Sequence, residues 1–268
     1  MSQTLQNAPL LELIAEVKWV PPWVPQAMVA GVPRMVPQNL QEFSAFVDAF
    51  SRSVASLEYT EQLRLYPQEL PALLHQPLIR ANNAKATIGP SLYQAGLGVF
   101  SANATPPYKN WEMFSPVVRS GLEALVSARN AVTDVAPVAS ITLRYLDAFT
   151  AYHLHGLEST AFIKELGFEL QAPKISLDYM AKDGACKPYS QFHIPLTDGG
   201  LLAMSVGDGI ANGTPAVLLD TAVTFFPNAE VSTDQIMESF VRAHEIIDDI
   251  FRVMIKPIAH LMRAEGEK

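Results

Sequence analysis

The chain has 268 residues, of which 49% are hydrophobic and 17% charged, and its formal net charge at pH 7 is −8. This composition excludes an intrinsically disordered chain and predicts a compact core, in one large domain or in two of about 130 residues. The negative charge, with lysines and arginines scattered singly, argues against broad electrostatic binding to nucleic acid or to anionic lipid.

The cysteine count and the distribution of apolar residues bear on the compartment. Cys186 is the single cysteine, which excludes an intrachain disulfide and a cysteine-rich zinc site and favours a reducing compartment. The first residues lack a basic region followed by an apolar stretch, and no apolar run is long enough to span a bilayer. We therefore expect a cytoplasmic protein with no membrane partner.

In the first half, strands and amphipathic helices alternate. Leu10 to Val20 has period-two alternation, and it leads into a proline-rich loop over 21–37. Gly96 and Gly98 either weaken the second strand or mark a bulge in it. The expected elements are strand 10–20, helix 40–57, strand 93–102, helix 111–130 and strand 138–152.

The second half repeats this rhythm. Asp198-Gly199-Gly200 predicts a hairpin, and residues 207–213, rich in glycine, predict a flexible hairpin loop. The expected elements are helix 159–170, strands near 174–181, 188–196, 201–207 and 216–226, and a final helix over 233–264.

These elements predict an α+β fold in which helices pack on one side of antiparallel sheets. One possible domain organisation is two halves, 1–155 and 156–268, each of which would resemble a ferredoxin-like β-α-β-β-α-β unit. A single compact domain is the other organisation, since no linker rich in Pro, Gly or Ser separates the halves.

The strand around 141–149 carries two charges in an otherwise apolar run. Asp147 shares the parity of Tyr145, whereas Arg144 points to the opposite face. A charge in a sheet core is costly unless it is paired. Arg144 and Asp147 therefore either stabilise the fold or mark a site. In the first case, Arg144→Ala should cost several kcal/mol, as the loss of one member of a buried pair does.

His153 and His155 are the strongest candidates for metal ligands. On a continued strand both imidazoles would lie on the face of Asp147, and His193 could add a further ligand for zinc or iron. The simpler alternative is that the strand ends here and both histidines are solvated.

Several other side chains suit an apolar pocket with polar handles. Tyr108, Trp111 and Tyr145 have this character, and His244 could transfer protons in a site where Arg144 binds an anion. Trp111 as a core anchor and His244 as a structural histidine at the edge of its helix's apolar stripe are the competing interpretations. The proline-rich loop over 21–37 is the best candidate for an exposed apolar binding surface.

Three stretches resemble a known group of proteins. They are Tyr108-Lys109-Asn110-Trp111-Glu112-Met113-Phe114, Leu143-Arg144-Tyr145-Leu146-Asp147 and Ala243-His244-Glu245-Ile246-Ile247-Asp248-Asp249-Ile250-Phe251-Arg252. Together they resemble a sporadically distributed bacterial family of uncharacterised function, in which Asn is more frequent at the position of Asp147. That resemblance implies an accessory gene in a defence, mobile-element or toxin-neutralising context.

Two functional hypotheses follow. The first is a cytoplasmic binding protein without a cofactor, an antitoxin, immunity or defence accessory factor that contacts a protein partner and not nucleic acid. The second is an enzyme or small-ligand binder whose pocket between sheet and helices is centred on Arg144. The sequence leaves the oligomeric state open, and a homodimer is compatible with it.

Overall fold

The structure is a computed structural model that describes residues 7–24, 35–38, 40–83, 90–108, 110–169, 179–181, 187 and 189–262. Its strands are β1 (Leu10–Trp19), β2 (Met35–Val36), β3 (Glu61–Arg64), β4 (Ala72–Leu73), β5 (Pro77–Asn83), β6 (Ser91–Gly96), β7 (Val99–Ala104), β8 (Val138–Phe149), β9 (Tyr189–Pro195), β10 (Leu201–Ala211) and β11 (Thr214–Phe225). Its helices are α1 (Gln41–Ala55), α2 (Trp111–Asn130), α3 (Ala151–Leu154), α4 (Ser159–Glu165), α6 (Thr233–Met254) and the 3-10 helix η1 (Lys256–Leu261).

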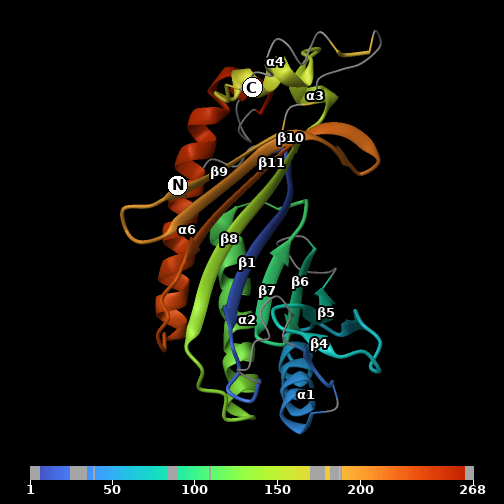
Figure 1. The fold of residues 1–268 in the computed structure, drawn as a ribbon, viewed down its shortest axis with the longest axis vertical. Helices are drawn as coiled ribbons and strands as arrows, with labels where there is room; N and C mark the ends of the chain where they lie inside the picture. The colour runs from blue at the N-terminus through green and yellow to red at the C-terminus, as the bar shows by residue number, and fades with distance from the viewer. Residues whose placement is uncertain are drawn as a thin grey trace. The chain divides into compact units, whose positions relative to one another are not determined.

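Nine strands form one antiparallel sheet, and helices pack against it (Figure 1). The strand order is β3-β5-β6-β7-β1-β8-β11-β10-β9, and β2 pairs with β4 in a separate two-stranded sheet. The predicted α+β class is confirmed. The described elements of the second half run α4-β9-β10-β11-α6, which does not by itself complete the order considered for a ferredoxin-like half.

The chain divides into two compact units. Unit 1 comprises Met1–Leu11, Arg144–Val223 and Glu245–Lys268, and unit 2 comprises Glu12–Leu143 and Thr224–His244. The units are interleaved in sequence, whereas the halves 1–155 and 156–268 are contiguous. That division into halves stays a prediction.

Unit 2 is built on the elements with the clearest periodicity. The apolar residues of α1 recur every three or four positions, which buries Phe43, Phe46 and Phe50. α2 begins at Asn110, whose side-chain oxygen accepts the backbone N–H of Met113 at 3.0 Å. Helices 40–57 and 111–130 are therefore confirmed. Asn39, the cap expected for α1, lies outside the described residues.

The strand expected over 93–102 is instead a hairpin, and this prediction was wrong. β6 and β7 pair antiparallel, with Gly96 opposite Val99, and the chain reverses at Leu97-Gly98. Gly98 has φ +68°, and a Cβ there would lie 2.3 Å from the backbone oxygen of Trp19. The glycine that was expected to weaken the strand or mark a bulge in it forms the turn, because only glycine fits this conformation and this approach.

Unit 1 contains the hairpins of the second half. β9 and β10 are joined through Gly199, which has φ +83°, so the predicted hairpin is confirmed. A hairpin does lie within 207–213, but the loop is shorter than expected, because β10 continues to Ala211. Asn212 and Gly213 alone make the turn, with φ +50° and +79°, as a tight two-residue hairpin turn requires.

The longest predicted strand, 138–152, and the longest predicted helix, 233–264, end earlier than expected. β8 stops at Phe149 and α3 begins at Ala151, and α6 stops at Met254 before η1. Cys186, most of the proline-rich loop and most of the strand expected near 174–181 lie outside the described residues. Within the described ranges, no helix combines the length and the apolar character needed to cross a membrane.

Candidate functional site

The structure distributes the predicted site residues over three places. β8 carries one group in unit 1, the start of α2 and the middle of α6 carry a second in unit 2, and α3 with the residue after it carries the third. In that order the groups are Arg144, Tyr145 and Asp147; Tyr108, Trp111 and His244; and His153 and His155.

Arg144 is paired within unit 1. Its Nε and Nη2 donate to the two carboxylate oxygens of Asp220 on β11, at 2.7 and 2.5 Å. This two-pronged geometry is the strong form of an arginine–carboxylate contact. The arginine side chain nevertheless remains 45% exposed, so the pair lies at the surface and not in the sheet core.

Asp147 is the buried charge of this strand, with 4% of its surface exposed. Burial, and to a smaller extent the negative charge of Asp220, together raise the pKa of its carboxyl from 3.8 to about 7. This shift favours the protonated carboxylic acid, which resembles an amide in shape and in its ability to donate a hydrogen bond.

Tyr108, Trp111 and His244 are linked by ring contacts that run from Tyr108 to Phe114, then to Trp111 and then to His244. The rings of Trp111 and His244 stack with centroids 5.2 Å apart and planes 19° apart, and Trp111 and Tyr108 each meet Phe114 edge-on at about 6 Å. Trp111 is 6% exposed, as a core anchor is. The cluster therefore joins α2 to α6 within unit 2. Tyr145 belongs to unit 1 and is partly buried on β8.

His153 and His155 do not share a strand face, because the chain turns into α3 after Phe149. His153 is buried, its Nδ1 accepts the backbone N–H of Thr150 at 3.2 Å, and its Nε2 donates to the backbone oxygen of Asn7 at 3.0 Å. His155 adopts a left-handed conformation and lies edge-on to His260 at 6.4 Å. In the part of the chain that the structure describes, no group of three or more His, Cys, Asp or Glu side chains is placed to hold a metal.

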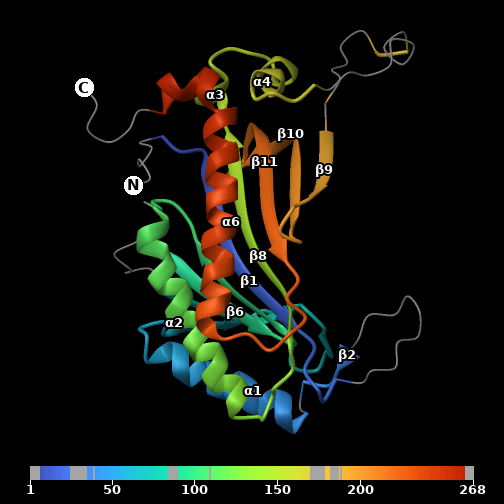
Figure 2. The same cartoon turned by 90° about the vertical axis from the view of Figure 1, so that its left-hand side faces the viewer.

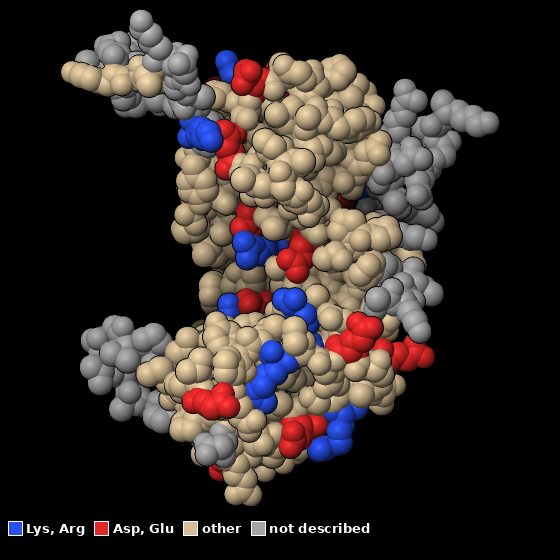
Figure 3. Space-filling model, turned by 90° about the vertical axis from the view of Figure 1, so that its right-hand side faces the viewer, with Lys and Arg blue, Asp and Glu red and all other residues tan. Residues whose placement is uncertain are grey.

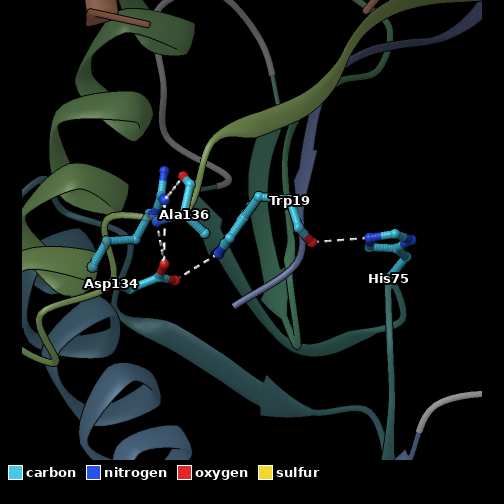
Figure 4. A network of polar contacts seen from close by, with 5 residues as sticks. Trp19, His75, Asp134 and Ala136 are labelled. Atoms are coloured by element: carbon cyan, nitrogen blue, oxygen red, sulfur yellow. Dashed lines mark hydrogen bonds and ion pairs between the residues drawn. The ribbon is translucent and has the colours of Figure 1, made fainter. Parts of the chain in front are cut away.

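A buried polar network in unit 2 was missed by the sequence analysis (Figure 4). The indole N–H of Trp19 donates to Asp134 at 2.6 Å, and Arg129 pairs with the same carboxylate at 3.3 Å while its guanidinium lies 5.0 Å from the Trp19 ring centre. His75 donates to the backbone oxygen of Trp19, and Arg129 also donates to that of Ala136. The sequence did not indicate that Asp134 is buried, because its partner Trp19 lies 115 residues away along the chain.

Several exposed apolar side chains of unit 2 lie on or next to segments that Gln38 holds in place. The buried amide of Gln38 donates to the backbone oxygens of Pro67 and Leu70 at 2.8 and 2.6 Å and accepts from Arg64. Four large apolar side chains of these segments and of the adjoining β2 and β3 are between 39% and 56% exposed. We call this surface the Gln38 platform; it consists of Met35, Leu63, Tyr66 and Leu70.

Charged side chains of both signs are mixed on the face shown in Figure 3, and no basic stripe crosses the described residues there. Comparison with known protein families finds none that matches this chain, and comparison with curated proteins finds no match either. The family resemblance noted from three stretches of sequence therefore stays a prediction.

Proposed function

We propose that this protein acts by protein–protein contact, and that the Gln38 platform is the surface that contacts the partner. A role as an antitoxin, immunity or defence accessory factor is the form of this proposal that the sequence resemblance favours. The observation that carries it is the group of large apolar side chains left exposed beside the segment singled out from the sequence.

The position of the platform supports a binding role. Met35 and Leu70 are about half exposed, although each belongs to a segment fixed by backbone pairing or by Gln38. Apolar groups that are both exposed and held in place lose little conformational entropy when a partner covers them. Met35 also lies within the proline-rich loop over 21–37, which was the best candidate for a binding surface.

The internal pairing of the predicted ligand-binding residues also supports this choice. Arg144 is held by both oxygens of Asp220, and Trp111 packs against His244 and Phe114. An anion binding to Arg144 would have to compete with a carboxylate that is already in place.

The test is affinity purification of the tagged chain from its native cells, with the double variant Met35→Glu/Leu70→Glu in parallel. A stoichiometric protein partner that the double variant loses supports the proposal. Val241→Glu is the matched control, because Val241 is also an exposed apolar residue of unit 2, 41% exposed, but lies on α6. Retention of the same partner by the double variant would contradict the platform as the contact surface.

A second candidate function, a small-ligand binder or enzyme, is favoured by one observation on β8. Asp147 has a pKa of about 7 and lies on the same strand as Arg144, and a group that exchanges a proton near neutral pH suits acid–base chemistry. Native mass spectrometry of the freshly purified chain tests it. A bound anionic metabolite that Arg144→Gln loses would support this candidate over the first.

A further inference from the structure

The two terminal strands of the nine-stranded sheet differ in charge. β3 carries Glu61 and Arg64 among its four residues. β9 has seven residues, Tyr-Ser-Gln-Phe-His-Ile-Pro, and none of them is lysine, arginine, aspartate or glutamate. Charged side chains on an edge strand oppose pairing with another chain, so β3 has this protection and β9 lacks it.

The backbone groups on the outer side of β9 follow from its hairpin with β10. The N–H of Leu196 donates to the oxygen of Gly200 at 2.8 Å, so this is a hydrogen-bonded pair. Bonded and non-bonded pairs alternate along an antiparallel ladder. Ile194, Phe192 and Ser190 therefore bond to β10, and Tyr189, Gln191 and His193 direct their N–H and C=O groups outward.

The side chains of β9 are also uncovered. Tyr189 is 69%, Phe192 39% and Ile194 46% exposed, even though the ring of Phe168 packs on Phe192 at 5.8 Å. Figure 2 shows β9 as the last strand beside β10, and no strand of the described residues pairs with its outer side. An uncharged edge with aromatic and β-branched residues is suited to strand addition.

We propose that β9 pairs antiparallel with β9 of a second copy of this chain, about a two-fold axis at Gln191. Outward-facing residues must meet outward-facing residues, so Gln191 lies opposite its own equivalent and Tyr189 lies opposite His193 of the second copy. Ser190 then lies opposite Phe192. This register uses all three outward-facing residues, and it ends before Pro195, which has no N–H to donate.

Charge is the reason for choosing a second copy as the occupant. The chain carries a net charge of −8, so most of its surface repels another copy. β9 is a place where two copies meet with no like-charge contact, and an antiparallel edge is complementary to itself under two-fold symmetry. Salt should therefore strengthen the dimer, because it screens the repulsion between the rest of the two surfaces. This interface lies in unit 1 and is independent of the Gln38 platform in unit 2.

Sedimentation velocity of the full chain from about 1 to about 100 µM tests the proposal. We expect a monomer–dimer equilibrium for the wild type. Gln191→Lys should raise the dimer dissociation constant at least about tenfold, because two ammonium groups meet at the axis. Gln62→Lys is the matched control on the opposite terminal strand, and it should leave the equilibrium unchanged.

A disulfide cross-link at the two-fold axis tests the register of the β9–β9 pairing directly. This test does not require the Gln191→Lys variant to fold. A hydrogen-bonded antiparallel pair separates its Cα atoms by about 5.5 Å, which a disulfide can bridge. Gln191→Cys in a Cys186→Ser background should form a covalent dimer on mild oxidation, and Gln62→Cys in the same background should not. A wild type that stays monomeric to about 100 µM, or a dimer that Gln191→Lys leaves intact, would overturn the proposal.

Discussion

Arg144 and Arg129 show how solvent exposure decides how much an arginine–aspartate pair contributes to stability. Each arginine binds an aspartate, but the Arg144 side chain is 45% exposed and that of Arg129 13%. The carboxylate partners differ too, since the side chain of Asp134 is 1% exposed and that of Asp220 25%. Solvent screens the first pair and leaves the second to act in a low-dielectric interior.

Arg144→Ala should lower the free energy of unfolding by less than about 1 kcal/mol, because exposed pairs contribute little. This replaces the loss of several kcal/mol expected from the sequence, which assumed a buried pair. Urea denaturation of the purified variant at neutral pH measures the difference. A loss above about 2 kcal/mol would show that the pair stabilises the fold despite its exposure.

Arg129→Met should be far more damaging, with a loss of about 3–5 kcal/mol, because the Asp134 carboxylate is left buried without its cation. The indole of Trp19 and the backbone N–H of Ala136 would still donate to Asp134, but two neutral donors do not replace a charge. Arg129→Met/Asp134→Asn should recover part of the loss by removing the buried charge. If the double variant is no more stable than Arg129→Met alone, the buried charge is not the cause.

Asp147 gives the stability of the protein a definite pH dependence. Between its unfolded pKa of 3.8 and its folded pKa of about 7, the folded state holds a proton that the unfolded state has released. The free energy of unfolding therefore decreases as the pH rises through this interval, by on the order of 4 kcal/mol, and changes little above it.

Asp147→Asn should remove this contribution and make the protein more stable than the wild type at pH 8. Urea denaturation at several pH values between 5 and 8 measures both slopes. Asp208→Asn is the matched control, because Asp208 is exposed on β10. A wild-type slope that Asp147→Asn leaves unaltered would place the titrating group elsewhere.

At the scale of the element, long periodic segments were predictable. α1, α2, β1 and β11 each present an uninterrupted apolar face, and a face of that length fixes both the type of element and the side that is buried. Short elements such as β3 and β4 gave no such signal, because four and two residues do not establish a period.

The errors have a common physical cause, which is that tertiary neighbours decide how a glycine or a strand end is used. Gly98 forms a turn because the backbone of Trp19, far away in sequence, leaves no room for a side chain. Asp220 lies 76 residues after Arg144, so their pairing depends on how β8 and β11 align and could not be inferred from spacing. Arg144 stood out in the sequence as a charge within an apolar strand, whereas its partner Asp220 did not.

Gly98→Ala and Gly213→Ala separate backbone strain from steric conflict. Both glycines have positive φ, but a Cβ at Gly98 meets Trp19 oxygen at 2.3 Å, and a Cβ at Gly213 meets nothing within 4 Å. We expect a loss of about 1 kcal/mol for Gly213→Ala and a clearly larger one for Gly98→Ala. Thermal denaturation of the two variants side by side measures the difference, and equal losses would contradict the steric contribution.

At the scale of the whole molecule, interleaving of the two units predicts that neither contiguous half folds alone. Fragment 1–155 lacks the Thr224–His244 segment of unit 2, and fragment 156–268 lacks the Arg144–Phe149 portion of β8 that belongs to unit 1. Each fragment would expose apolar surface that the missing segment covers. Nuclear magnetic resonance spectra of the isolated fragments should show little dispersion, and co-expression should restore it. A well-dispersed spectrum from either fragment alone would support the contiguous halves.

The hydrogen bonds of Asn7 and Pro9 can form only late in synthesis, because their partners are made long after these two residues. The side chain of Asn7 donates to the backbone oxygen of Leu261, 254 residues later, and the oxygen of Pro9 accepts the N–H of Ala148. At about 5–20 residues per second, a ribosome needs roughly 13 to 50 s to make the chain between Asn7 and Leu261. The later part of β1, from Leu13 to Lys18, pairs with β7, which is complete after Ala104. The C-terminal part of β1 can therefore pair with β7 before the residues at its N-terminal end find their partners. The residues made first are among the last to form their hydrogen bonds.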